Sequence, residues 1–167
     1  MASGRTVHRI VAVQYQLINK LRDRRAFDVA ARTPSDEDFS SFKRARQCLL
    51  VTYRRSGEPV PSPVNYGLGE DGKLYIRTDG NSAKVKRVRA NPQVVVVPCG
   101  LRGTPRGPGV RGTARILPPS EEARADAIIA SNWSPAMKVL ERGLDKAANR
   151  FDMPIVYVEI TSATAAG

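Results

Sequence analysis

The sequence predicts a mainly β domain of the α+β class, built from six largely antiparallel strands with flanking helices. Short segments that alternate, or that are rich in β-branched residues, recur six times between residues 47 and 161. Hairpin-type turns join the first three of them. One helical segment follows the third strand, and two more precede the sixth. No internal repeat and no low-complexity run interrupts this pattern.

The first half of the predicted sheet is a meander of three strands. We expect these strands at Gln47–Arg54, Val60–Leu68 and Lys73–Thr78. Glycine-containing turns at Ser56–Glu58 and Gly69–Gly72 join them as hairpins. Pro61 and Pro63 place the second strand at an edge or at a bulge, because proline cannot donate a hydrogen bond to a ladder.

A short basic helix follows the meander. The turn Asp79–Ser82 supplies N-cap residues, and the helix is expected over Ala83–Ala90. Asn91 precedes a proline and ends the helix, because a residue in that position avoids the helical conformation. The next strand, Gln93–Val97, is apolar and β-branched, which is typical of a strand buried on both faces.

This helix is a candidate seat for a phosphate group. The N-terminus of a helix presents unpaired N–H groups and a partial positive charge. Lys84 and Arg87 are three residues apart and therefore share one helical face. Together, the helix terminus and the two cations predict an anion site.

The remaining elements lie on either side of this central unit. A short helix is expected after an N-cap at Ser35, with Phe39 and Phe42 facing inward. The other predictions are a strand at Val110–Leu117, a helix at about Glu121–Ala130, a helix from Ser134 to about Arg150 and a last strand at Pro154–Thr161.

Composition narrows the possible partners. The chain has 167 residues and a formal net charge of +11. This charge favours an anionic partner, which is a nucleic acid, a membrane surface or a phosphorylated small molecule. Composition alone does not choose among the three.

Several classes of protein are disfavoured. No stretch of about 18 apolar residues exists, so no membrane span is expected, and no secretory signal is recognised. Cys48, Cys99 and the single histidine, His8, lack the spacing of metal ligands, which argues against a zinc site and a histidine-based triad. We therefore expect a cytoplasmic protein without a metal.

The first 34 residues form a basic extension to a domain that covers residues 35–167. Apolar residues recur there at helical spacing, and arginine and lysine occupy much of the remaining surface. This pattern fits a helix packed on the domain or a loosely ordered extension. It also fits a basic amphipathic helix that makes weak contact with anionic lipid or closes over a ligand.

Three segments and their spacing carry a resemblance to a known family. They are RRSGEPVPSPVNYG, LYIRTDGNSAKVKRVRANPQVVV and VRGTARIL. From about Asp36 to Ala163 the chain resembles the flavin/deazaflavin oxidoreductase superfamily, whose fold is the split β-barrel of FMN-binding, pyridoxamine-phosphate-oxidase-like proteins. The most similar branch is the actinobacterial one that uses the deazaflavin coenzyme F420. The first 34 residues fall outside the resemblance.

The resemblance implies a homodimer with each cofactor in a groove between subunits. Lys84 matches the lysine that contacts the cofactor phosphate in the family. Ser82 stands where family members often have a basic residue, so one charge is missing here. Arg77 and Thr78 match the strand end beside the cofactor tail.

Other positions match the surroundings of the cofactor ring. The matching residues of the second strand are Ser62, Pro63, Val64 and Asn65. Arg111 matches a position that faces the cofactor from the fifth strand. By charge alone, Arg87, Arg102 and Arg106 are candidates to meet the acidic oligoglutamate tail of the deazaflavin.

The function implied by the resemblance is hydride transfer between the deazaflavin coenzyme F420 and a small conjugated organic substrate. The cofactor carries this chemistry, so no catalytic side chain is assigned. An FMN-binding flavoprotein of the same fold is one alternative. A non-enzymatic nucleic-acid-binding module is another, disfavoured because the basic residues are dispersed and only 6% of residues are aromatic.

Overall fold

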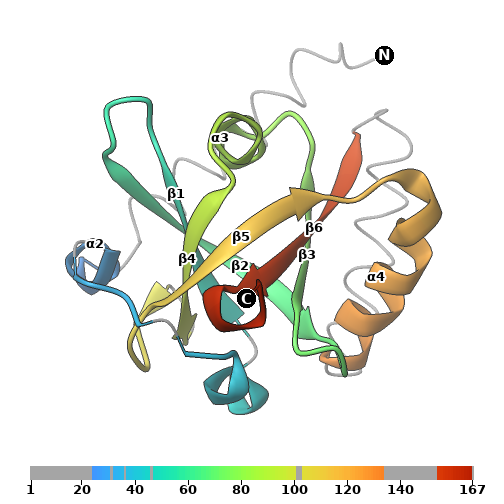
Figure 1. Cartoon of the computed structure of the whole chain (residues 1–167), viewed down its shortest axis with the longest axis horizontal. Coiled ribbons are helices and arrows are strands. Elements are labelled where there is room, and N and C mark those ends of the chain that lie inside the picture. Colours follow the sequence, from blue (N-terminus) through green and yellow to red (C-terminus); the bar gives the residue numbers. More distant parts are fainter. Residues whose placement is uncertain are drawn as a thin grey trace, which may run out of the picture.

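The six predicted strands form one closed antiparallel barrel. The computed structural model describes residues 24–30, 32–35, 37–45, 47–100, 103–133 and 154–166. The strands are β1 (Gln47–Tyr53), β2 (Pro59–Leu68), β3 (Leu74–Asp79), β4 (Gln93–Cys99), β5 (Val110–Ile116) and β6 (Ile155–Ser162). They follow the order β1-β2-β3-β6-β5-β4 around the barrel (Figure 1). The predicted six-stranded antiparallel barrel is therefore confirmed.

Helices cover the outside of the barrel and lie at its two ends. They are α2 (Arg25–Ala30), α3 (Ala83–Ala90), α4 (Pro119–Ser131) and the 3-10 helices η1 (Ser40–Arg44) and η3 (Ala163–Ala166). Helix α2 packs on the outer face of β1 and β4, α4 packs beside β3 and β6, and α3 lies across a barrel end (Figure 1). No helix in the described part of the chain is long and apolar enough to span a membrane.

Two of the predicted helices agree closely with the structure. Helix α3 has the predicted bounds, and α4 begins two residues before the predicted Glu121. The helix expected from Ser134 to Arg150 lies outside the described residues, as does most of the predicted extension over residues 1–34. The division between that extension and residues 35–167 stays a prediction.

The predicted N-cap at Ser35 is wrong. The Ser35 N–H donates to the carbonyl oxygen of Gly109 at 2.8 Å, so this residue pairs with the start of β5. The helix is the 3-10 helix η1, and the Asp38 carboxylate accepts a hydrogen bond from the Ser40 N–H at 2.9 Å. A contact across 74 residues overrode the local capping preference.

Three aromatic rings close the end of the barrel opposite α3. Phe39 and Phe42 are both 1% exposed, as predicted for inward-facing residues. The Phe42 ring meets Phe39 and Tyr66 edge to face, with centroids 5.5 and 5.7 Å apart. The Tyr66 hydroxyl has one hydrogen, which it shares between the carbonyl oxygens of Phe42 (2.5 Å) and Ala45 (2.6 Å). These contacts fasten η1 to β2.

Strand β2 is paired on both sides for only part of its length. Its register with β1 covers Pro59 to Asn65, whereas its register with β3 covers only Tyr66 to Leu68. The first half of β2 is therefore an edge facing β3. Pro61 and Pro63 lie in this half, where a missing N–H is tolerated. The predicted edge position of the prolines is confirmed for this half of β2, which pairs with β1 but not with β3.

Candidate functional site

Helix α3 turns two basic side chains toward the barrel end that it covers. Lys84 is 9% exposed, and its Nζ donates to the Thr78 Oγ1 at 2.8 Å. Arg87 Nε donates to the Thr52 Oγ1 at 2.7 Å. Val88 of the same helix belongs to the barrel core. The shared face follows from the three-residue spacing, and each cation lies over a different strand.

The N-terminus of α3 has no side-chain cap. Ser82 occupies the N-cap position with extended backbone angles, yet its side chain makes no capping hydrogen bond. Its Oγ is buried and has no hydrogen-bond partner among the described residues. The first turn contains no acidic residue. The predicted capping role of Ser82 is therefore wrong, although Ser82 does occupy the N-cap position.

Thr78, Ser82 and Lys84 form one polar group, which we call the α3 seat. It combines a hydroxyl without a partner, open N–H groups of the first helical turn and a buried ammonium. All of these are hydrogen-bond donors that belong to the first turn of α3 or to its N-cap. Such a set fits a phosphate, because orphaned N–H groups at a helix start and a lysine both stabilise negative charge.

The four predicted residues of β2 divide between its two faces. Ser62 and Val64 share the inward face with the core residue Tyr66, and both lie in the half that β3 leaves unpaired. Pro63 and Asn65 face outward, where the Asn65 Oδ1 accepts a hydrogen bond from the Gln47 Nε2 at 3.2 Å. Only the first pair points the same way as Thr78.

Arg77 and Arg111 do not join the α3 seat. Arg77 lies on the outer face of β3, opposite Tyr157 of β6. Arg111 is exposed on β5, and its Nη2 donates to the Pro34 carbonyl oxygen at 3.4 Å. Burial raises the pKa of the Tyr53 phenol, and the positive charge of the nearby Arg111 partly offsets this rise.

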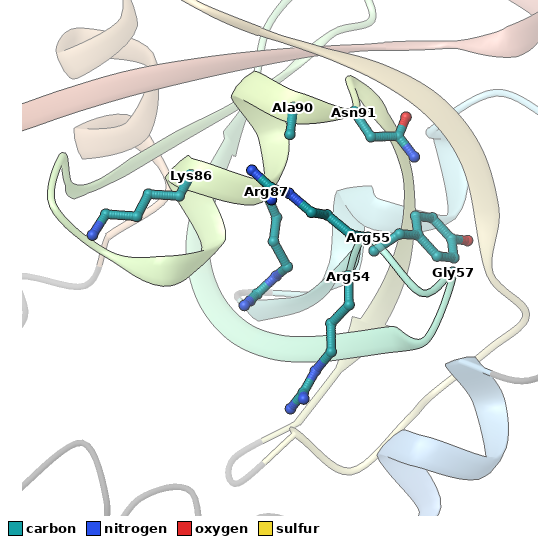
Figure 2. A pocket seen from close by; sticks show the side chains of 8 residues that line it. Arg54, Arg55, Gly57, Lys86, Arg87, Ala90 and Asn91 are labelled. Carbon is teal, nitrogen blue, oxygen red and sulfur yellow. The ribbon is translucent and has the colours of Figure 1, made fainter.

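A second group of basic residues surrounds a hollow between α3 and the β1–β2 hairpin. This basic hollow has a volume of about 640 Å³. Figure 2 shows Arg54 and Arg55 from the hairpin beside Arg87 from α3, with Lys86 extending away from them. Its lining is Tyr53, Arg54, Arg55, Gly57, Lys86, Arg87, Ala90 and Asn91.

Of the basic residues that line the hollow, only Arg87 is predicted from the sequence to meet the cofactor. Arg54 and Arg55 begin the first of the three resembling segments but carry no predicted role. The available signal was two consecutive arginines at a hairpin, followed along the chain by a basic helix. These residues line one hollow only because the hairpin and α3 lie on two sides of it in the fold. No local pattern in the sequence predicts that arrangement.

Neither group forms an acid–base pair. The α3 seat and the basic hollow contain hydroxyls, an amide and cations, and the lining of the hollow includes no carboxylate. What these groups can do is bind and orient anions. Redox chemistry at this surface would have to come from a bound cofactor.

Comparison with known proteins agrees with this architecture. The family profile described as pyridoxamine 5'-phosphate oxidase matches residues 35–156. No curated protein sequence matches the chain significantly.

Solved structures share the fold at low sequence identity. A candidate 5-nitroimidazole antibiotic resistance protein from Bacteroides thetaiotaomicron is 17% identical with a TM-score of 0.51, covering 74% of this chain and 79% of that one. A conserved hypothetical protein from Mycobacterium tuberculosis is 21% identical with a TM-score of 0.52, covering 71% and 74%. A heme-binding protein from Mycobacterium smegmatis is 17% identical with a TM-score of 0.50, covering 78% and 52%.

Proposed function

Because the chain belongs to the pyridoxamine 5'-phosphate oxidase family, we propose that it is an oxidoreductase using a phosphorylated, flavin-type cofactor. The family includes flavin-binding oxidoreductases, and some proteins of similar fold bind heme. The observation that carries the proposal is the α3 seat, where Ser82 Oγ is buried without a partner beside Lys84. A buried hydroxyl that lacks a partner costs free energy, and an incoming phosphate oxygen would satisfy it.

The seat would hold the cofactor phosphate, and the unpaired half of β2 would lie beside the ring. Lys84 and the first-turn N–H groups would neutralise the phosphate, while Ser62 and Val64 would line the ring from the inward face of β2. The bound cofactor would supply hydride transfer. The protein would orient the ring and exclude water from it.

We propose the deazaflavin coenzyme F420 as the cofactor, with FMN as the alternative. The resemblance in the segments around α3 supports the deazaflavin. Both cofactors present a phosphate and a tricyclic ring, so the α3 seat accommodates either one.

A small conjugated molecule stacked on the ring would be the substrate, and a cytoplasmic homodimer would be the working unit. Light scattering of the purified protein tests the dimer.

Titration with each cofactor tests the function directly. We expect one of them to bind with a Kd below about 100 μM, followed by cofactor fluorescence. Lys84→Met should weaken this binding by about tenfold, because a charge-assisted contact is lost. Arg89→Gln is the matched control, since Arg89 is exposed on the same helix, and it should change the Kd by less than about twofold. Absence of binding by both cofactors would refute the proposal.

Ser82→Ala separates binding from folding. Since its Oγ has no hydrogen-bond partner among the described residues, removing it should leave the thermal midpoint unchanged or slightly higher. The same change should weaken cofactor binding several-fold, because the phosphate loses a donor. Unchanged affinity, measured on a folded variant, would remove Ser82 from the seat.

A further inference from the structure

We propose that the basic hollow is a second anion site, which binds a small molecule through a diphosphate group. The hollow lies between the β1–β2 hairpin and α3 (Figure 2). Four of its eight lining residues are arginine or lysine, and none is acidic. A volume of about 640 Å³ is in the range of small-molecule sites.

Arg87 is anchored by the fold, and backbone hydrogen bonds fix the hairpin that carries the other two arginines. The Arg87 Nε donates to Thr52 Oγ1, and Thr52 is fully buried, so this guanidinium is anchored at one nitrogen. Its two terminal nitrogens have no hydrogen bond to a described residue. The hairpin is fixed by hydrogen bonds from the Arg54 N–H to the Glu58 carbonyl oxygen and from the Gly57 N–H to the Arg54 carbonyl oxygen, both 2.9 Å. Gly57 adopts φ 83°, which permits the tight turn.

Carboxylates do little to neutralise these charges. The acid that reaches an arginine of the hollow is Glu58, whose Oε2 lies 3.3 Å from the Arg54 Nε. The two side chains are 60% and 59% exposed, and pairs this exposed contribute little stability. In the described part of the chain, Arg55 makes no hydrogen bond or ion pair. The lining of the hollow therefore holds three guanidinium groups and one weak counter-charge.

Burial and a neighbouring positive charge both act on Arg87. Burial lowers the pKa of its guanidinium, and the neighbouring Arg54 lowers it further. Both effects reflect a cation held where positive charge is unfavourable. A bound polyanion removes that cost, since it supplies the charge that the lining lacks.

The geometry favours a diphosphate over a single monoanion. An arginine fork matches the paired oxygens of a phosphate, so three forks can engage two adjacent phosphates at once. The four lining residues that are not basic, Tyr53, Gly57, Ala90 and Asn91, offer contacts to an organic portion of the ligand. The hollow is concave and includes one aromatic residue, whereas single-stranded nucleic acids use repeated aromatic platforms along a groove.

The basic hollow is separable from the α3 seat. Lys84 reaches Thr78 on β3, whereas Arg87 reaches Thr52 on β1. Lys84 does not line the hollow, and neither Arg54 nor Arg55 belongs to the seat. This inference therefore does not depend on the identity of the proposed cofactor.

Calorimetric titration of the full-length protein with inorganic pyrophosphate tests the proposal. At about 0.1 M ionic strength, we expect saturable binding with a Kd below about 1 mM. Inorganic phosphate should bind at least about tenfold more weakly, because it engages fewer arginines.

Arg55→Gln should weaken pyrophosphate binding by about tenfold, and Arg89→Gln, the control on α3, by less than about twofold. Glu58→Gln should strengthen binding by about twofold, because it frees the Arg54 Nε.

Each contrary outcome is informative. Equal affinity for phosphate and pyrophosphate would overturn the diphosphate assignment. Equal losses from Arg55→Gln and Arg89→Gln would mean that net charge alone attracts the anion. Tighter binding of a short DNA, weakened alike by both variants, would assign the surface to nucleic acid instead. Lys84→Met should leave pyrophosphate binding within about twofold while it weakens the cofactor, so the two proposals fail separately.

Discussion

Replacing Phe42 by alanine is expected to lower the free energy of unfolding by about 3–5 kcal/mol. The Phe42 ring is 1% exposed and makes edge-to-face contacts with both Phe39 and Tyr66. Its removal leaves a cavity between η1 and β2 that the closed barrel cannot collapse to fill. Thermal unfolding should show a midpoint lower by about 10 °C.

Phe42→Leu separates loss of volume from loss of ring geometry. Leucine keeps most of the apolar volume but not the two aromatic contacts, so about 1–2 kcal/mol should be lost. Cofactor and pyrophosphate affinities of this variant should equal those of the parent protein, because Phe42 lies at the barrel end opposite α3. If Phe42→Ala lowered the free energy of unfolding by less than about 1 kcal/mol, the aromatic cluster would not be a major source of stability.

Local sequence patterns predicted most of the fold, because the ends of its helices and strands are set by nearby proline and glycine residues. The bounds of α3 follow from Asn91 before a proline and from the turn that precedes the helix. Both hairpins of the meander contain a glycine with positive φ, Gly57 and Gly72. Pro61 and Pro63 predicted an edge, and β2 is an edge over that half.

Features that depend on distant partners were not predictable in this way. Ser35 looks like an N-cap in its local context, yet it pairs with Gly109. Ser82 occupies an N-cap position, yet its hydroxyl is buried without the expected bond. In both cases a tertiary contact or site decides what a polar side chain does.

In the candidate site too, local spacing predicted some features and the tertiary arrangement decided the others. Spacing on one helix predicted that Lys84 and Arg87 share a face. Spacing did not show that Lys84 would reach β3 while Arg87 would reach β1, because that depends on how α3 crosses the barrel end. The resemblance treated Arg111 as part of the same site, whereas the structure places it on the outer face near Tyr53. Two anion sites are therefore proposed where the sequence indicated one.

The second large effect is expected at Gly67, where β2 meets α4 without an intervening side chain. A Cβ at this position would contact the Ile128 carbonyl oxygen and would lie 2.6 Å from the Ile128 carbonyl carbon and 2.7 Å from the Ile129 Cα. These are backbone atoms of a helix, so no side-chain rotation relieves the clash. The Asn132 Nδ2 donates to the Tyr66 carbonyl oxygen at 2.8 Å and holds the end of α4 against β2.

Gly67→Ala should therefore destabilise the protein by about 3 kcal/mol, the upper range for overpacking, as measured by urea denaturation. Gly57→Asn is the control, because no atom lies within 4 Å of its added Cβ and asparagine tolerates its φ of 83°. That control should cost less than about 1 kcal/mol. If the two variants were equally stable, the contact between α4 and β2 would be loose, and α4 would be free to move relative to the barrel. If only Gly67→Ala is destabilised, the position of α4 is fixed by backbone contact, and glycine at residue 67 is a requirement of the fold.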